Sequence, residues 1–169
     1  MVAPAQALNA GLVHDGLVSF TGGAAEEINL RGEGGAGGVE ALWARLRTYE
    51  RSGFLMGAGS PPGADTAAGA VNGIVQGHAY ALLRMDEVRL DDAKVKMILL
   101  RNPWKANPVT DHPLDWSPTS PLWRQTGGEY MKTRLAYDPE APGTDAGLMW
   151  LAFEDFVHAF ATIFVCRCV

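Results

Sequence analysis

The chain has 169 residues, which is enough for one compact domain and too few for two ordinary ones. Its apolar fraction of 47% and charged fraction of 20% are those of a globular protein and exclude a disordered, collagen-like or coiled-coil chain. Fourteen Lys and Arg against nineteen Asp and Glu give a net charge of −5, so the charge gives no reason to expect binding to nucleic acid or to an anionic membrane surface.

The N-terminal segment does not have the pattern of a signal peptide. No Lys or Arg occurs before Arg31, so the positive region of a signal peptide is missing. The longest apolar run, residues 159–165, is too short to span a bilayer. Cys166 and Cys168 are separated by one residue, and on an extended strand they would stand about 6.6 Å apart, too far for a good disulfide. These features predict an intracellular protein in a reducing compartment without a membrane span.

Glycine and proline predict three loops, at residues 32–38, 57–73 and 105–121, because these residue types interrupt regular structure. The first loop also fits the pattern G-x-G-x-x-G before a helix. A dinucleotide site needs a buried strand in front of that pattern, and residues 26–30 make a poor strand. A flexible loop before a helix is therefore the favoured interpretation.

The segments between the loops predict the regular elements. Leu42, Trp43, Leu46 and Tyr49 lie at helical spacing, which predicts a helix over residues 39–51. Apolar runs and turn residues predict an antiparallel hairpin, with strands at 78–88 and 94–101 and a turn at 89–92. They also predict a short strand that begins at 54–56, a strand at 148–153, a short helix at 154–160 and a final strand at 162–169. Few helices and several strands predict an α+β fold, a mainly antiparallel, barrel-like β lobe.

The chain stops within the mainly apolar strand ATIFVCRCV and has no polar tail. A strand that stops in this way is expected to leave an open edge that needs a partner. We therefore expect the chain to be a piece of a longer protein.

Histidine and cysteine spacing gives little support for a metal site. His14, His112 and His158 show no ligand spacing with one another or with the cysteines. A zinc site made of Cys166, Cys168 and a distant histidine stays a weak alternative, because structural zinc usually takes cysteines separated by two to four residues. The acidic residues at 26–27 and 86–92 are interpreted as solvated faces and turns.

His78 and Asn102 form the most informative pair. His78 precedes the first hairpin strand and Asn102 follows the second, so a turn near residues 90–91 places His78 opposite about residues 102–104. An Asn oxygen that accepts from one ring N–H would fix the tautomer and aim the other nitrogen outward, and Trp104 could shield that bond from water. On spacing alone, a histidine in a turn and an asparagine that caps a strand stays an open alternative.

Short motifs recur along the chain in a defined order. They are Leu17 with Thr21-Gly22-Gly23, Glu26-Glu27, Leu42-Trp43, Gly53-Phe54-Leu55-Met56-Gly57, Gly77-His78-Ala79-Tyr80, Arg101-Asn102-Pro103-Trp104, Trp116-Ser117, Ser120 with Trp123, and Met149-Trp150 with Glu154-Asp155-Phe156. Together they resemble the calpain family, and more narrowly the second half of the calpain protease core, over about residues 11–167.

The resemblance implies a papain-like thiol protease of two lobes, with the active site in the cleft between them. One lobe brings the Cys nucleophile, and the other, which this chain resembles, brings the catalytic His and the orienting Asn. His78 and Asn102 match those two residues, and Trp104 matches the tryptophan beside the Asn that forms the wall of the cleft. Neither Cys166 nor Cys168 matches the nucleophile, so this chain alone is expected to be inactive.

The resemblance also implies a calcium ion in this lobe, but the acidic motifs differ here. Trp116-Ser117-Pro118 stands where Trp-Ser-Asp is expected, and Ala146-Gly147-Leu148 stands where Asp-Gly-Glu is expected. Ca²⁺ takes about six to eight oxygen ligands, so the site is expected to be degraded. The weak candidates are Asp111, Asp115 and Asp145, and Asp138 and Glu140 could compensate. Lys105 replaces the glycine expected after Trp104.

These observations predict an N-terminal tail at residues 1–10 and a protease lobe at 11–169 that needs a Cys-bearing lobe as partner and a polypeptide as substrate. The predicted function is intracellular peptide-bond hydrolysis by a Cys-His-Asn triad, with His78 and Asn102 supplied by this chain. The alternative is a non-catalytic, calpain-like binding or regulatory module.

Overall fold

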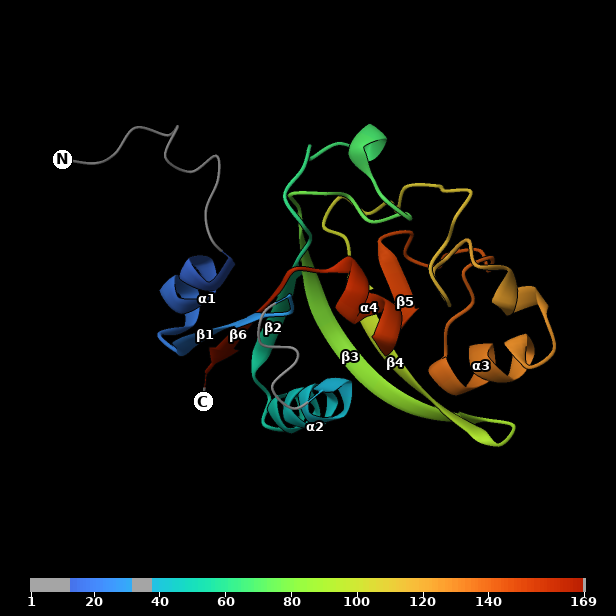
Figure 1. The fold of residues 1–169 in the computed structure, drawn as a ribbon, viewed down its shortest axis with the longest axis horizontal. Helices are drawn as coiled ribbons and strands as arrows, with labels where there is room; N and C mark the ends of the chain where they lie inside the picture. The colour runs from blue at the N-terminus through green and yellow to red at the C-terminus, as the bar shows by residue number, and fades with distance from the viewer. Residues whose placement is uncertain (1–12, 32–37, 169) are drawn as a thin grey trace.

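The computed structural model describes residues 13–31 and 38–168. Figure 1 shows the elements in their order along the chain. They are α1 (Val13–Thr21), β1 (Ala24–Asn29), α2 (Gly38–Arg51), β2 (Leu55–Gly59), η2 (Ala67–Gly69), β3 (Ala79–Leu90), β4 (Ala93–Arg101), η3 (Pro121–Arg124), α3 (Gly128–Leu135), β5 (Leu148–Ala152), α4 (Phe153–Ala159) and β6 (Thr162–Arg167). The predicted α+β fold with mainly antiparallel strands is confirmed.

One sheet of six strands organises the molecule, in the order β1-β6-β2-β3-β4-β5, and every neighbouring pair is antiparallel. In Figure 1, α1 lies with β1 and β6 at one end of the molecule and α3 lies at the other, with the long curved β3–β4 hairpin between them. The hairpin turns at Asp91 and Asp92, as predicted, and Asp91 adopts a left-handed φ of 52°.

The expectation that the last strand leaves an open edge is wrong. Strand β6 lies inside the sheet, where Ile163 pairs with Ile28 of β1 on one side and with Ala58 of β2 on the other. The edge strand beside β6 is β1, which includes part of the segment 26–30 that makes a poor strand by sequence. An edge strand needs few apolar residues, and Ile28 is its only buried residue. Since β1 is an antiparallel edge, it is not the buried strand that a dinucleotide site requires.

Three further differences concern small residues and amphipathic segments. Strand β2 continues to Gly59, three residues into the predicted 57–73 loop, because β3 and β6 bond to it on both sides. Helices α1 and α3 were not expected from the sequence. The glycine pattern at residues 32–37 and the tail at 1–10 lie outside the described residues. No helix of the described chain is long and apolar enough to cross a membrane.

Both faces of the β3–β5 region are covered by a hydrophobic core. In β4, Ile98 faces a core shared with α2 and α4, and its neighbour Met97 faces a second core that includes Trp123 and residues of α3. Adjacent residues of a strand point to opposite faces, so a strand that is covered on both sides is apolar at successive positions. This double coverage explains the unbroken apolar runs of β4 and β5 and holds the end of the hairpin in place.

Candidate active site

Ser60 and a close glycine contact position the backbone of His78, which lies directly before β3. The His78 N–H donates to Ser60 Oγ (2.9 Å), and the His78 carbonyl accepts from the Ser60 N–H (3.0 Å) and hydroxyl (3.1 Å). Gly77 has a φ of +63°, and a Cβ there would lie 2.6 Å from the Gly63 carbonyl oxygen. Glycine is therefore required at position 77, and the histidine is presented from a backbone with little freedom.

Asn102 fixes the orientation of the imidazole. The fully buried Asn102 side chain donates from Nδ2 to the Ala106 carbonyl (2.7 Å), and its Oδ1 accepts from the Trp104 N–H (3.0 Å). The same Oδ1 lies 3.0 Å from His78 Nε2. Because Oδ1 can only accept, Nε2 is the donor and Nδ1 faces away from Asn102. The meeting of imidazole and carboxamide that the hairpin register predicts is confirmed, while their catalytic role stays a prediction.

Two aromatic rings enclose the imidazole. The Trp104 ring centre lies 4.6 Å from that of His78 at 52°, and Tyr80 makes an edge contact at 5.0 Å. Trp104 remains 44% exposed, as expected for a residue that lines an open surface rather than a core. Burial raises the pKa of Tyr80 to about 12, so its hydroxyl stays neutral and accepts from the Val75 N–H (2.9 Å). The His78 side chain thus lies between one buried and one exposed ring.

The backbone of Gly147 lies against the backbone of Asn102 and Lys105, and the sequence alone did not reveal this contact. The Asn102 N–H donates to the Gly147 carbonyl (2.8 Å). A Cβ on Gly147 would lie 2.7 Å from the Asn102 carbonyl oxygen and 2.9 Å from Lys105 Cα. Lys105 itself has a left-handed φ of 57°, which explains why a glycine is expected at this step. The departure at Lys105 and the glycine kept at position 147 therefore both bear on the placement of the asparagine.

Asp65 is a second residue that the sequence did not single out. Its Oδ1 lies 2.8 Å from His78 Nδ1, the nitrogen that faces away from Asn102. The Asp65 side chain is 56% exposed and that of His78 only 7%. No local motif marks Asp65, because the contact depends on how the whole 60–77 loop folds back over the start of β3.

The two cysteines are not placed for catalysis. Cys166 is buried in β6, where its Sγ lies 3.1 Å from Thr21 Oγ1, and Cys168 follows that strand. Both thiols are free, as predicted. The ring interactions of His78 in the described part of the chain involve Asp65, Tyr80, Asn102 and Trp104 and neither cysteine.

The weak calcium candidates do not converge. Asp145 pairs with Arg101 (2.8 Å) and accepts from the Gly147 N–H. Asp111 and Asp115 line one shallow hollow with Asp155, and desolvation together with the charge of Asp155 raises the pKa of Asp115. Over residues 13–31 and 38–168, no three His, Cys, Asp or Glu side chains are grouped to hold a metal ion. The described residues therefore fit neither a calcium site nor a zinc site that includes Cys166 and Cys168.

The two compensating acids that the sequence offers are already paired with cations. Asp138 lies 3.6 Å from Lys132, and Glu140 forms an ion pair with Arg124. A hard cation would have to displace these contacts before it could use either carboxylate.

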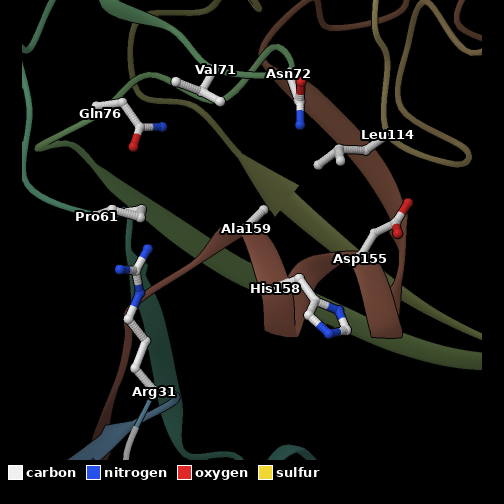
Figure 2. Close-up of a pocket in the computed structure, with 9 residues that line it drawn as sticks. All are labelled: Arg31, Pro61, Val71, Asn72, Gln76, Leu114, Asp155, His158 and Ala159. Carbon is white, nitrogen blue, oxygen red and sulfur yellow. The ribbon is translucent and has the colours of Figure 1, made fainter.

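Two cavities lie near the segment that leads through the 60–77 loop to His78 and Ala79. An apolar hollow of about 320 Å³ lies beside the site and is lined by Val13, Leu17, Met56, Ala79 and Pro103 among others. A second cavity of about 270 Å³, drawn in Figure 2, lies between the 60–77 loop and helix α4. Pro61 and Gln76 line it from the loop, and Asp155 and His158 line it from the helix. None of the residues in contact with the His78 ring lines that second cavity. The apolar hollow is therefore the one adjacent to the candidate chemistry.

Comparison with known proteins gives a consistent picture. Residues 2–167 match the family described as "Calpain family cysteine protease". The chain is 41% identical over 164 residues to "Calpain-type cysteine protease DEK1" of Zea mays, 35% over 179 residues to "Calpain-5" of Mus musculus and 31% over 164 residues to "Calpain-9" of Rattus norvegicus. These alignments cover 96%, 97% and 96% of this chain but only 7%, 26% and 22% of the respective relatives.

Proposed function

The chain belongs to the calpain family of cysteine proteases, and on that premise we propose that it is the His- and Asn-bearing lobe of a cysteine endopeptidase. The observation that carries the proposal is the 3.0 Å contact between His78 Nε2 and an Asn102 oxygen whose orientation two further hydrogen bonds determine. That arrangement leaves Nδ1 as the nitrogen available to a nucleophile.

The nucleophile has to come from another part of the protein or from another chain, because Cys166 and Cys168 lie away from the imidazole. With a thiol placed at His78 Nδ1, the ring takes its proton, and the thiolate sulfur attacks the carbonyl carbon of the peptide bond. His78 then donates that proton to the leaving amine, and an acyl-enzyme remains. Water hydrolyses the acyl-enzyme with the same ring as base, which regenerates the thiol.

Asn102 and Trp104 are positioning residues in this scheme. Asn102 accepts from Nε2–H and so keeps Nδ1 aimed at the nucleophile through both proton transfers. Trp104 covers the imidazole and limits the access of water to the His78–Asn102 bond. The apolar hollow beside Ala79 is suited to an uncharged side chain of an extended peptide.

The test supplies the missing lobe. The chain is expressed together with a Cys-bearing lobe, from its own transcript or grafted from a family member, and hydrolysis of a fluorogenic peptide is measured. We expect no activity from the 169-residue chain alone. In the two-lobe protein, His78→Ala is expected to lower kcat by about 10²–10⁴-fold, the contribution typical of a positioned acid–base group. Asp92→Ala, at the exposed turn of the hairpin, is the matched control. Activity that survives His78→Ala would refute the proposal.

A non-catalytic module is the second candidate, and the placement of Cys166 and Cys168 favours it. In that case, a two-lobe protein that folds and contains a thiol would still hydrolyse no peptide. The search would then turn to what the face around Trp104 binds.

A further inference from the structure

The contact between Asp65 and His78 has a consequence for the proposed chemistry. We infer that Asp65 is a displaceable cap on the catalytic face of the imidazole, which holds the position that the thiol must occupy. The inference rests on the proposed function of His78. Asp65 Oδ1 lies 2.8 Å from Nδ1, the nitrogen left free by Asn102.

The hydrogen-bond pattern determines the character of this contact. The Trp104 N–H donates to Asn102 Oδ1, which confirms that the amide oxygen, not the amide nitrogen, faces His78. Because an oxygen of this kind only accepts, His78 Nε2 carries a proton. In a neutral ring the other nitrogen would then present a lone pair to the lone pairs of Asp65. A separation of 2.8 Å needs a hydrogen between the two atoms, so one of them, Nδ1 or the carboxyl oxygen, carries it while the contact is made. Asp65 thus occupies the position at which the thiol would bond to the ring.

The loop that carries Asp65 is built to reach the histidine. The Gly77 N–H donates to the Pro61 carbonyl (2.7 Å), and a Cβ on Gly63 would lie 2.4 Å from Gln76 Cβ. The two ends of the loop are therefore packed backbone to backbone just before His78. Thr66, the next residue after Asp65, caps η2 through its side chain, which accepts from the Gly69 N–H (3.1 Å).

The side chain of Asp65 can nevertheless leave without unfolding the loop. It is 56% exposed, and its partner in the described chain is the His78 ring, so rotation into solvent breaks one ion pair. A half-exposed pair of this kind is weak, and a docked thiolate that loses its own hydration can displace it. The geometry therefore describes an obstacle that a second lobe removes when it binds.

The first experiment probes the cap without any catalysis. Diethyl pyrocarbonate acylates a ring nitrogen that has a free lone pair, and mass spectrometry gives the rate at each histidine of the 169-residue chain. Removing a half-exposed ion pair should raise the rate at His78 about two- to fivefold in Asp65→Ala. Asp92→Ala should leave that rate unchanged, and the exposed His112 serves as an internal reference. Equal rates at His78 in all three proteins would overturn the inference.

The second experiment uses the two-lobe protein and separates this inference from the proposed function. Without its competitor, the thiol should be alkylated by iodoacetamide about two- to fivefold faster in Asp65→Ala, and kcat should rise with little change in KM. A fall in both rates would show that Asp65 assists the ring, and would overturn the cap. If His78→Ala keeps its activity, the proposed function fails, while the acylation rates still decide whether Asp65 covers Nδ1.

Discussion

At the scale of single residues, the His78 ring is oriented by contacts from segments that are distant in sequence. Asn102 comes from the end of β4, and the Gly147 carbonyl that receives the Asn102 N–H comes from the segment before β5. Because backbone groups hold Asn102 in place, an atom added on Gly147 would shift Asn102 and with it the hydrogen bond that orients the His78 ring. This makes Gly147 a sharper test of the site than any surface residue.

Gly147→Ala is expected to damage the site without unfolding the lobe. The added Cβ would lie 2.7 Å from the Asn102 carbonyl oxygen, so one of the two segments must shift. Overpacking of this kind costs about 1–3 kcal/mol of stability. Misplacing a positioning group lowers kcat by about tenfold or more. Thermal unfolding and kcat of the two-lobe protein check both effects.

Gly16→Ala is the matched control for that variant. It lies in α1, and its Cβ would meet no atom within 4 Å. The helix should gain up to about 1 kcal/mol of stability, because alanine is the better helix former. If Gly147→Ala keeps the activity and stability of the Gly16→Ala protein, the claimed support of Asn102 is wrong.

At the scale of elements, one carboxylate joins the edge strand to its neighbours. Glu26 of β1 forms ion pairs with Arg45 of α2 and Arg167 of β6, and it accepts from the Tyr49 hydroxyl (3.0 Å). Burial acts to raise the pKa of Glu26, but the Arg167 and Tyr49 hydrogen bonds and the two arginine charges outweigh it, so this pKa lies below its ordinary value. The cluster explains how a strand with little apolar surface stays attached.

The Glu26 cluster predicts a loss of stability in acid. Because its pKa is lower in the folded than in the unfolded protein, Glu26 stabilises the fold above its ordinary pKa of 4.5, and the contribution is lost as the pH falls through the folded value. Glu26→Gln should cost about 1 kcal/mol at neutral pH. The difference between the two proteins in urea unfolding should narrow from about pH 6 to about pH 3. A difference independent of pH would contradict this assignment.

At the scale of the whole molecule, two cores share one set of strands. The first contains Trp43 and the aromatic residues of α4, and the second contains Trp116, Trp123 and Tyr137. Trp123 is 1% exposed, and its Nε1–H donates to the Ser117 carbonyl (2.8 Å). Since β3, β4 and β5 separate the two cores, loss of either core exposes an apolar face of the same sheet.

The shared strands predict one cooperative unfolding transition. Tryptophan fluorescence and far-ultraviolet circular dichroism should give the same denaturation midpoint. Trp123→Ala should lower the free energy of unfolding by about 3–5 kcal/mol and still give coincident curves. Trp43→Ala, in the other core, should do the same. Separate midpoints for the two probes would show that the cores fold independently.

The local sequence was sufficient for the hairpin and for the pairing within the site. The apolar runs on either side of Leu90 and Asp91 set the register, and the register brings His78 to Asn102. These runs also predict the strands β3 and β4, since run length and turn residues are local properties of the sequence. Helix α2 was likewise evident from its spacing.

Tertiary structure decided the features that depend on partners outside the local sequence. Strand β1 has the composition of a loop and is held by β6 and the Glu26 cluster, and β2 continues through Gly57 and Gly59 because strands bond to it on both sides. The contact of Asp65 with His78 arises from the packing of Gly63 against Gly77. Local sequence determines the apolar strands and the turn between them, whereas only the packed chain determines which weak segments become strands, which backbones approach closely and which charges meet.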